Sequence, residues 1–330
     1  MKKPFSSDVL KIDAEKEADQ ISSRLRECLA KQLKRRGLVV GLSGGIDSSV
    51  TVALSARALG PKRVVALLMP ERHSADDTLQ LSEKVADHFG VEKYHENISG
   101  ILEAVGFYKR YDEAVRIVIP EYGEGWKSKI VTPSVLDDRS YNLFSIVALD
   151  PEGAVVKKRL NLKSYLEIVA ATNFKQRIRK MLEYHYADRF NYAVAGTPNR
   201  LEYDQGFFVK NGDGAADIKP IAHLYKTQVY QLAEYLGVPE EIRRRPPTTD
   251  TYSLEQGQDE FYFSLTYQKL DLCLYGKNNG IDPATLAGAV ALTPEQVQRV
   301  FDDIDIKRST THTLHLPPLL VGQVPEIHFE

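Results

Sequence analysis

The sequence predicts an α/β protein built on a doubly wound parallel sheet. Short apolar runs at 38–42 and 63–69 alternate with helical patterns at 50–59 and 76–90. Each apolar run is continuous, which is typical of a strand buried on both faces of a parallel sheet. Alternation of strands and helices places the helices on both faces of that sheet.

The other elements follow from their own patterns. Residues 8–36 show apolar side chains at helical spacing, with Ser7 or Asp8 as the expected cap and Gly37 as the stop. The remaining expected elements are a helix at 164–190, a strand at 192–197, a helix at 222–236 and, beyond it, short helices and loops rich in Pro and Gly.

Composition narrows the class of protein. The 330 residues are 43% hydrophobic, which is enough to bury a core, and we expect a single domain over 1–330. A formal net charge of -2 supplies no basic field for nucleic acid. Two cysteines exclude a disulfide scaffold and an all-cysteine metal site. With no signal peptide and no apolar run of membrane-spanning length, we expect a cytoplasmic protein.

The segment 43–49, Ser-Gly-Gly-Ile-Asp-Ser-Ser, lies between an expected strand and an expected helix. Adjacent glycines let backbone N–H groups approach an anion, and the helix N-terminus adds partial positive charge. The carboxylate of Asp47 fits this setting if Mg²⁺ bridges it to the anion. The side chains of Ser43, Ser48 and Ser49 add hydroxyl donors. The segment therefore predicts a phosphate-binding loop.

This segment resembles the SGGxDSS pyrophosphate loop of the N-type ATP pyrophosphatases, which cleave ATP between the α- and β-phosphates and adenylate a substrate. The rest of the chain resembles one family among them, the NAD synthetases, over about residues 20–100 and 165–318. The matching stretches are 173–179 (NxxxRxR), 196–202 (GTxNxxE), 206–220 (GYxTKYGDGxxDxxP), 224–229 (LxKTQV), 246–248 and 258–260.

The resemblance implies a fold of the adenine nucleotide α-hydrolase type and ATP-dependent amide formation through an acyl-adenylate. The implied substrates are deamido-NAD, ammonia and ATP with Mg²⁺, and the products are NAD, AMP and pyrophosphate. It also implies a homodimer with the acceptor site near the interface. No glutaminase domain fits in 330 residues beside the sheet, so nitrogen would come from free ammonia or a separate donor.

The resemblance also assigns residues to the site. Asp47, Ser48 and Lys226 are implied for catalysis, and Asp47 with Glu202 for the metal. ATP contacts are implied for Ser43, Gly44, Gly45, Asp47, Ser48, Ser49, Met69, Arg177, Thr197, Lys226 and Thr248. Acceptor contacts are implied for Asn173, Arg177, Lys210, Asp213, Asp217 and His312.

Residue chemistry supports several of these roles but leaves alternatives open. Lys226 lies at the start of an expected helix, where its positive charge interacts unfavourably with the helix dipole. A phosphate partner would explain this position. Asp213 between two glycines suits a turn that presents a carboxylate to ribose hydroxyls, or an Asx turn. Of Arg177 and Arg179, one is expected to reach a ligand anion and the other to face solvent. Glu202 is a hard oxygen ligand or a solvated loop carboxylate.

Departures from the family pattern keep a second function open. The family's Thr and Tyr in TKYGDG are Val209 and Asn211 here, and two cations near the C-terminus are Thr313 and Leu314. The alternatives are an amide ligase for a different carboxylate or amine, and a non-catalytic nucleotide-binding subunit.

Residues 104–162 interrupt the strand–helix pattern and form an expected insertion. Residues 141–150 and 154–162 are β-rich and flank an Asp-Pro-Glu-Gly turn, which predicts a hairpin. An isolated hairpin is marginal in water, so this one is expected to pack on the body or on a second subunit. We expect it near the acceptor end of the cleft as a lid; a surface decoration far from the site is the alternative.

Overall fold

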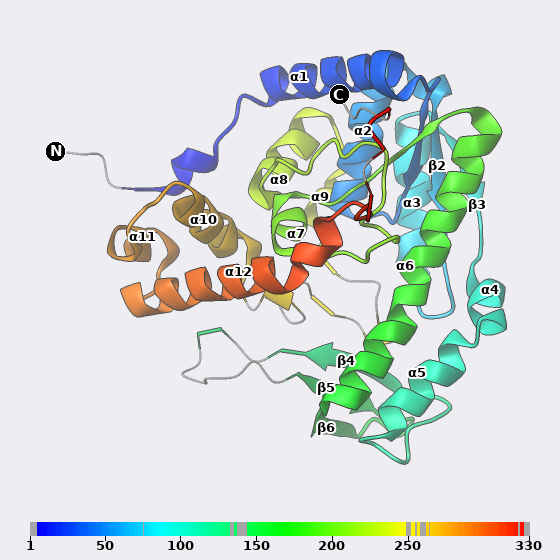
Figure 1. Cartoon of the computed structure of the whole chain (residues 1–330), viewed down its shortest axis with the longest axis vertical. Helices are drawn as coiled ribbons and strands as arrows, with labels where there is room; N and C mark the ends of the chain where they lie inside the picture. The colour runs from blue at the N-terminus through cyan, green and yellow to red at the C-terminus, as the bar shows by residue number, and fades with distance from the viewer. Residues whose placement is uncertain are drawn as a thin grey trace.

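The structure, a computed structural model, describes residues 5–74, 76–132, 135–136, 144–248, 252–254, 256–257, 262–263, 265–322 and 324–326. Its central sheet has four parallel strands in the order β3-β2-β1-β7. The strands are β1 (Leu38–Gly41), β2 (Val64–Leu68), β3 (Glu92–His95) and β7 (Ala193–Ala195). Figure 1 labels β2 and β3 of this sheet and, apart from them, the β4, β5 and β6 strands. The predicted parallel sheet is confirmed. Sequence reasoning missed β3, an edge strand of polar and half-buried residues that lacks an apolar run.

Successive residues of β1 enter two different cores, as a strand period of two requires. Leu38 and Val40 pack on one face, while Val39 packs on the other. Helices α1 (Ala14–Glu27), α2 (Ile46–Leu59), α3 (Asp76–His88) and α8 (Lys226–Tyr235) contribute to the first core. Helices α4 (Ser99–Ala104), α5 (Phe107–Arg116) and α6 (Leu162–Phe190) contribute to the second. The sheet is therefore covered on both faces, as predicted.

The N-terminal helix is shorter than the predicted 8–36. A 3-10 turn, η1 (Ser7–Leu10), precedes α1, and Asp13 caps α1 by accepting from the backbone N–H of Lys16. The chain continues as a π-helix, η2 (Cys28–Leu33), and Lys34 ends it in the left-handed conformation with φ 52°. The predicted caps at Ser7 and Asp8 are wrong, because Asp13 caps α1. The predicted stop at Gly37 is wrong, because the left-handed conformation of Lys34 ends the helix before it. A second 3-10 turn, η3 (Pro61–Arg63), leads into β2.

The inserted segment forms a three-stranded antiparallel sheet in the order β4-β5-β6. Strands β5 (Ser145–Leu149) and β6 (Val155–Arg159) pair as the predicted hairpin, with Ser145 opposite Arg159. Residues 141–143 of that prediction lie outside the described residues. Strand β4 (Lys127–Val131) and helix α5 were missed, because β4 mixes charged and apolar residues. Ile130 and Ile146 are fully buried in the second core, so this sheet packs on the body.

The C-terminal part is more regular than predicted. After α7 (Arg200–Gln205) and α8 come α9 (Glu240–Arg244), α10 (Tyr267–Asn278), α11 (Pro283–Val290) and α12 (Pro294–His315). The prediction of short helices is wrong for α12, whose 22 residues carry a Thr293 capping box. Helices α10, α11 and α12 build a third core, which encloses Cys273. Among the described helices, none combines the length and apolar character that crossing a bilayer requires.

The cap correction can be tested by replacing each candidate acid. Asp13→Ala removes the acceptor for the Lys16 N–H and should lower the free energy of unfolding by about 1 kcal/mol. Asp8→Ala, the matched control, touches only the exposed 3-10 turn and should change it by less than about 0.5 kcal/mol. Urea unfolding measures both, and equal losses would contradict the boundary at Asp13.

Candidate functional site

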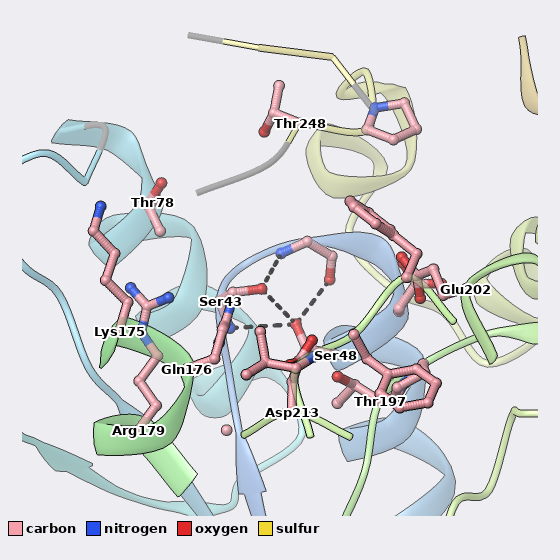
Figure 2. A pocket seen from close by; sticks show the side chains of 18 of the residues that line it. Ser43, Ser48, Thr78, Lys175, Gln176, Arg179, Thr197, Glu202, Asp213 and Thr248 are labelled. Atoms are coloured by element: carbon pink, nitrogen blue, oxygen red, sulfur yellow. Dashed lines mark hydrogen bonds between the residues drawn. The ribbon is translucent and has the colours of Figure 1, made fainter. Parts of the chain in front are cut away.

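A cavity of about 430 Å³ lies at the carboxyl ends of the central strands (Figure 2). After β1 the chain continues through α2 to β2, which pairs with β1 on one side. On its other side, β1 pairs with β7. This divergence is a topological switch point, where ligands bind in open α/β sheets. The cavity wall includes the loop after β1, Met69 after β2, Thr197 after β7, and parts of α6 and α8.

The loop after β1 is held by its own hydroxyls. Ser48 Oγ accepts from the Ser43 N–H at 3.3 Å and donates to Gly45 O at 3.0 Å. Gly44 has φ +70°, and a Cβ there would lie 3.0 Å from Leu81 Cβ, so the turn requires glycine. No side chain caps the N-terminus of α2 at Gly45. The loop thus places an uncapped helix N-terminus at the cavity, an arrangement that favours anions.

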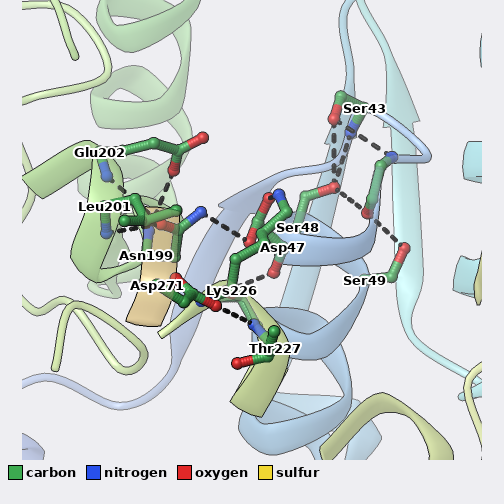
Figure 3. Close-up of polar contacts among 12 residues, drawn as sticks. Ser43, Asp47, Ser48, Ser49, Asn199, Leu201, Glu202, Lys226, Thr227 and Asp271 are labelled. Carbon is green, nitrogen blue, oxygen red and sulfur yellow. Dashed lines mark hydrogen bonds and ion pairs between the residues drawn. The ribbon is translucent and has the colours of Figure 1, made fainter. Parts of the chain in front are cut away.

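Asp47 on α2 forms an ion pair with Lys226 on α8 (Figure 3). Its other oxygen accepts from Asn199 Nδ2 at 3.1 Å. Asn199 caps α7, and its own N–H donates to Glu202 Oε2 at 3.0 Å in a capping box. Burial alone would lower the pKa of Lys226, but the charges of Asp47 and Glu202 hold that pKa above its usual value. Lys226, 1% exposed, therefore stays protonated between two carboxylates.

Asp271 on α10 fixes the start of α8. Its two oxygens accept from the backbone N–H groups of Lys226 at 3.2 Å and Thr227 at 2.7 Å. The carboxylate is fully buried, and burial raises the pKa of Asp271 to about 6. A carboxylate at a helix N-terminus interacts favourably with the helix dipole. Asp271 thereby holds the residue that pairs with Asp47.

Helix α6 contributes a polar face to the cavity. Lys175 Nζ donates to Glu71 Oε1 at 2.6 Å, and both side chains are buried. Burial alone would raise the pKa of Glu71, but Lys175 holds it below its usual value. One helical turn on, Lys180 Nζ donates to Glu183 Oε2 at 2.5 Å. Cations on this wall are thus oriented by buried carboxylates.

Comparison with known proteins identifies the family. The family model described as NAD synthase matches residues 17–121 and 134–317. This chain belongs to the NAD synthase family.

Two relatives are similar to this chain over nearly their whole length. The NH(3)-dependent NAD(+) synthetase of Rhizobium meliloti (strain 1021) is 59% identical over 98% of this chain and 96% of the relative. The protein of the same name from Mesorhizobium japonicum is 57% identical over 96% of this chain and 100% of the relative.

Solved structures share the NAD synthase fold. NMN synthetase from Francisella tularensis superposes with a TM-score of 0.64 at 22% identity, covering 94% of this chain and 99% of that one. NH3-dependent NAD synthetase from Campylobacter jejuni, in complex with the nitrate ion, superposes with a TM-score of 0.62 at 22% identity, covering 94% and 100%.

Most residues that the sequence assigned to the site converge on the cavity (Figure 2). They come from the loop after β1, the ends of β2 and β7, and helices α6, α7 and α8. The converging residues are Ser43, Gly45, Asp47, Ser48, Met69, Asn173, Thr197, Glu202, Asp213, Lys226 and Thr248. Asp213 Oδ1 also accepts from the Val209 N–H at 2.8 Å, and burial raises its pKa.

Two residues predicted to bind the acceptor make structural bonds instead of lining the cavity. Lys210 Nζ donates to the carbonyls of Thr313 at 2.7 Å and Leu316 at 3.2 Å, where it neutralises the end of α12. Asp217 Oδ2 accepts from the Val194 N–H at 2.7 Å and holds the outer edge of β7.

Four more predicted residues lie outside the cavity lining. Gly44 makes the turn of the loop, and Ser49 Oγ donates to Gly45 O at 2.8 Å. His312 is exposed on α12. Arg177 donates to Lys210 O at 3.3 Å, whereas Arg179 lines the cavity and donates to Met69 O at 3.4 Å. Of the two arginines, the structure turns Arg179 toward the ligand space.

Sequence reasoning missed most of a stripe of α6. Residues spaced by three and four along one helix share a face, and this spacing was visible in the sequence. The missed residues are Thr172, Lys175, Gln176, Lys180 and Glu183; they share this stripe with Arg179, which the sequence named as one of two candidates to reach a ligand anion. It also missed an aromatic end of the cavity, where the Phe144 and Tyr165 rings stack at 4.5 Å beside Tyr252. Nothing local in the sequence joins those three rings.

The two predicted metal ligands are compatible with Mg²⁺. Asp47 and Glu202 both line the cavity and both act on Lys226. Within the described residues no group of three or more His, Cys, Asp or Glu side chains could hold a metal ion. Two carboxylates beside a phosphate loop suit Mg²⁺, which keeps waters and phosphate oxygens as its other ligands.

The role of Asp271 predicts a pH-dependent stability. With its pKa raised to about 6, folded Asp271 holds a proton that the unfolded chain has released. Its contribution is present below the ordinary aspartate pKa and is lost as pH rises through about 6. The stability of the wild type relative to Asp271→Asn should therefore fall by about 2 kcal/mol between about pH 4.5 and 7. Urea unfolding at both pH values measures this difference, and a constant difference would contradict it.

Proposed function

We propose that the chain makes NAD from deamido-NAD and ammonia, with cleavage of ATP to AMP and pyrophosphate. It acts as a ligase that forms a carbon–nitrogen bond. One observation carries this proposal: in a member of the NAD synthase family, the phosphate loop, the Asp47–Lys226 pair and Glu202 line one cavity. The acceptor carboxylate attacks the α-phosphorus of ATP and pyrophosphate leaves. Ammonia then displaces AMP from the acyl-adenylate.

The residues at the loop would stabilise the departing pyrophosphate. The backbone N–H groups at the α2 N-terminus would donate to its oxygens, and protonated Lys226 would supply a fixed positive charge. Because these donors are held by the protein before substrate binds, little reorganisation is needed as charge develops. Catalysis by this site is thus mainly electrostatic and positional.

Asp47 and Glu202 would hold Mg²⁺ when ATP is bound, and the ion would then neutralise phosphate charge. Asp47 would divide its two oxygens between the ion and its protein partners, Lys226 and Asn199. Lys226 keeps the Asp47 carboxylate oriented, and Asn199 ties it to the helix that carries Glu202.

The acceptor is tested by weighing the product. Incubation with ATP, Mg²⁺, ammonium and deamido-NAD should give NAD, AMP and pyrophosphate by mass spectrometry. The nicotinate mononucleotide half of deamido-NAD is the matched alternative acceptor, because the Francisella protein with this fold is named NMN synthetase. Faster amidation of the mononucleotide would overturn the proposed acceptor. If free ammonium gives no product, the nitrogen must come from a separate donor.

Asp47→Asn should abolish turnover. The neutral amide loses the charge that pairs with Lys226 and the oxygen ligand for Mg²⁺, so pyrophosphate release should fall at least about 100-fold. Asp87→Asn removes an exposed carboxylate that pairs with Lys93 outside the cavity, and should leave the rate unchanged. Circular dichroism checks that both variants are folded. Near-normal pyrophosphate release by Asp47→Asn would refute the role.

We further propose a homodimer that uses the outer face of α6. Leu162, Leu166 and Met181 are 73%, 53% and 56% exposed on this helix. Long apolar side chains on one exposed helix are typical of an interface. An obligate two-fold dimer would bury at least about 2,000 Å² in total.

Light scattering at micromolar concentration should report a dimer for the wild type. Leu166→Glu places a charge on the proposed interface and should shift the protein toward monomer. Ile306→Glu changes an equally exposed apolar residue on α12 and should leave the dimer intact. A monomeric wild type, or a dimer lost only in Ile306→Glu, would rule out the α6 interface.

A further inference from the structure

The outer edge of the inserted sheet is occupied by a distant segment of the chain. Strand β4 lies at the edge of the β4-β5-β6 sheet and pairs on its inner side with β5. On its outer side, the Leu254 N–H donates to Ser128 O at 3.2 Å, and Gln256 Nε2 donates to Ile130 O. The backbone of Leu254 and the side chain of Gln256 thus cover an edge that would otherwise expose unpaired groups.

Buried hydroxyls fix this contact. Ser128 is fully buried, and its Oγ bonds to the hydroxyls of Tyr111 at 2.8 Å and Tyr122 at 2.9 Å. The Ser128 N–H donates to Ser253 Oγ at 2.9 Å. Ser128 therefore joins helix α5, strand β4 and the distant segment at one point. Because hydrogen bonds between hydroxyls are short and directional, this cluster fixes the position of the distant segment relative to β4.

The segment held in this way forms a wall of the cavity. Tyr252, 5% exposed, precedes Ser253 and lines the cavity. The Tyr252 ring lies 6.4 Å from that of Tyr111, which is itself a member of the hydroxyl cluster. Movement of the segment on β4 would therefore move the Tyr252 wall.

The aromatic end of the cavity and its Arg179 end are separated along helix α6. Tyr165, beside Tyr252 at the aromatic end, and Arg179, bonded to Met69, lie on the same helix α6. At about 1.5 Å of rise per residue, they stand about 21 Å apart along it. The ATP contacts that the resemblance implies at the loop and at Met69 lie at the Arg179 end, so we assign the aromatic end to the second substrate.

We infer that Ser128 and Ser253 are positioning residues for the acceptor, because together they anchor the Tyr252 wall of the cavity on strand β4. The inserted sheet thus acts on the reaction through its β4 edge rather than through the β5–β6 hairpin tip. This inference rests on the proposed function, since the acceptor used to test it is deamido-NAD.

The test separates the KM values of the two substrates. Ser253→Ala removes the acceptor of the Ser128 N–H and should raise the KM for deamido-NAD about five- to tenfold, with the KM for ATP within about twofold. Ser253→Thr restores a hydroxyl and should restore the KM. Ser128→Ala should act in the same direction as Ser253→Ala. Val155→Ser, on the exposed opposite edge of the same sheet, is the control and should change neither KM.

The outcomes are distinguishable. An unchanged KM for deamido-NAD in Ser253→Ala, in an enzyme whose wild type amidates deamido-NAD, overturns this inference and leaves the proposed function standing. Equal rises in both KM values also overturn it, because the wall would then serve ATP as well. A wild type that does not amidate deamido-NAD overturns the proposed function and this inference together. Circular dichroism confirms folding, and Ser253→Ala decides the matter if Ser128→Ala does not fold.

Discussion

The buried ion pair between Lys226 and Asp47 is the constraint on which the site depends. A fully buried ammonium is costly unless it is paired, so the fold must bring α8 against the N-terminus of α2. Asp271 fixes Lys226 at the start of α8. Asn199 bonds to Asp47 and so ties it to α7, the helix that carries Glu202. The pair therefore links the phosphate loop, the β7 loop and the third core.

Buried lysine–carboxylate pairs also occur along α6. Lys175 and Lys180 are held by Glu71 and Glu183, so the cavity keeps its cations oriented by carboxylates of the protein. Glu183 also approaches β1 so closely that a Cβ at Gly41 would lie 2.7 Å from its Oε1. Paired charges cost less to bury than single ones, and they present a defined geometry to an anionic substrate.

Local patterns in the sequence predicted strands β1, β2 and β7, the glycine-rich turn between β1 and α2, and the β5–β6 hairpin, because each depends on residues that are adjacent in the chain. The missed features depend on distant partners. Lys175 meets Glu71, and Lys210 meets Thr313, far along the chain. The lysine predicted to bind the acceptor therefore holds the end of α12, while Arg179 rather than its neighbour Arg177 lines the cavity. Strand β4 was missed because it mixes charged and apolar residues, and no local pattern could show that residues beyond 250 cover its outer edge.

The proposed mechanism requires that the cavity makes an acyl-adenylate before ammonia enters. Exchange of labelled pyrophosphate into ATP, with ammonium left out and deamido-NAD present, measures that step by itself. Exchange should require deamido-NAD and should be lost in Asp47→Asn. No exchange from a preparation that forms NAD once ammonium is added would contradict it.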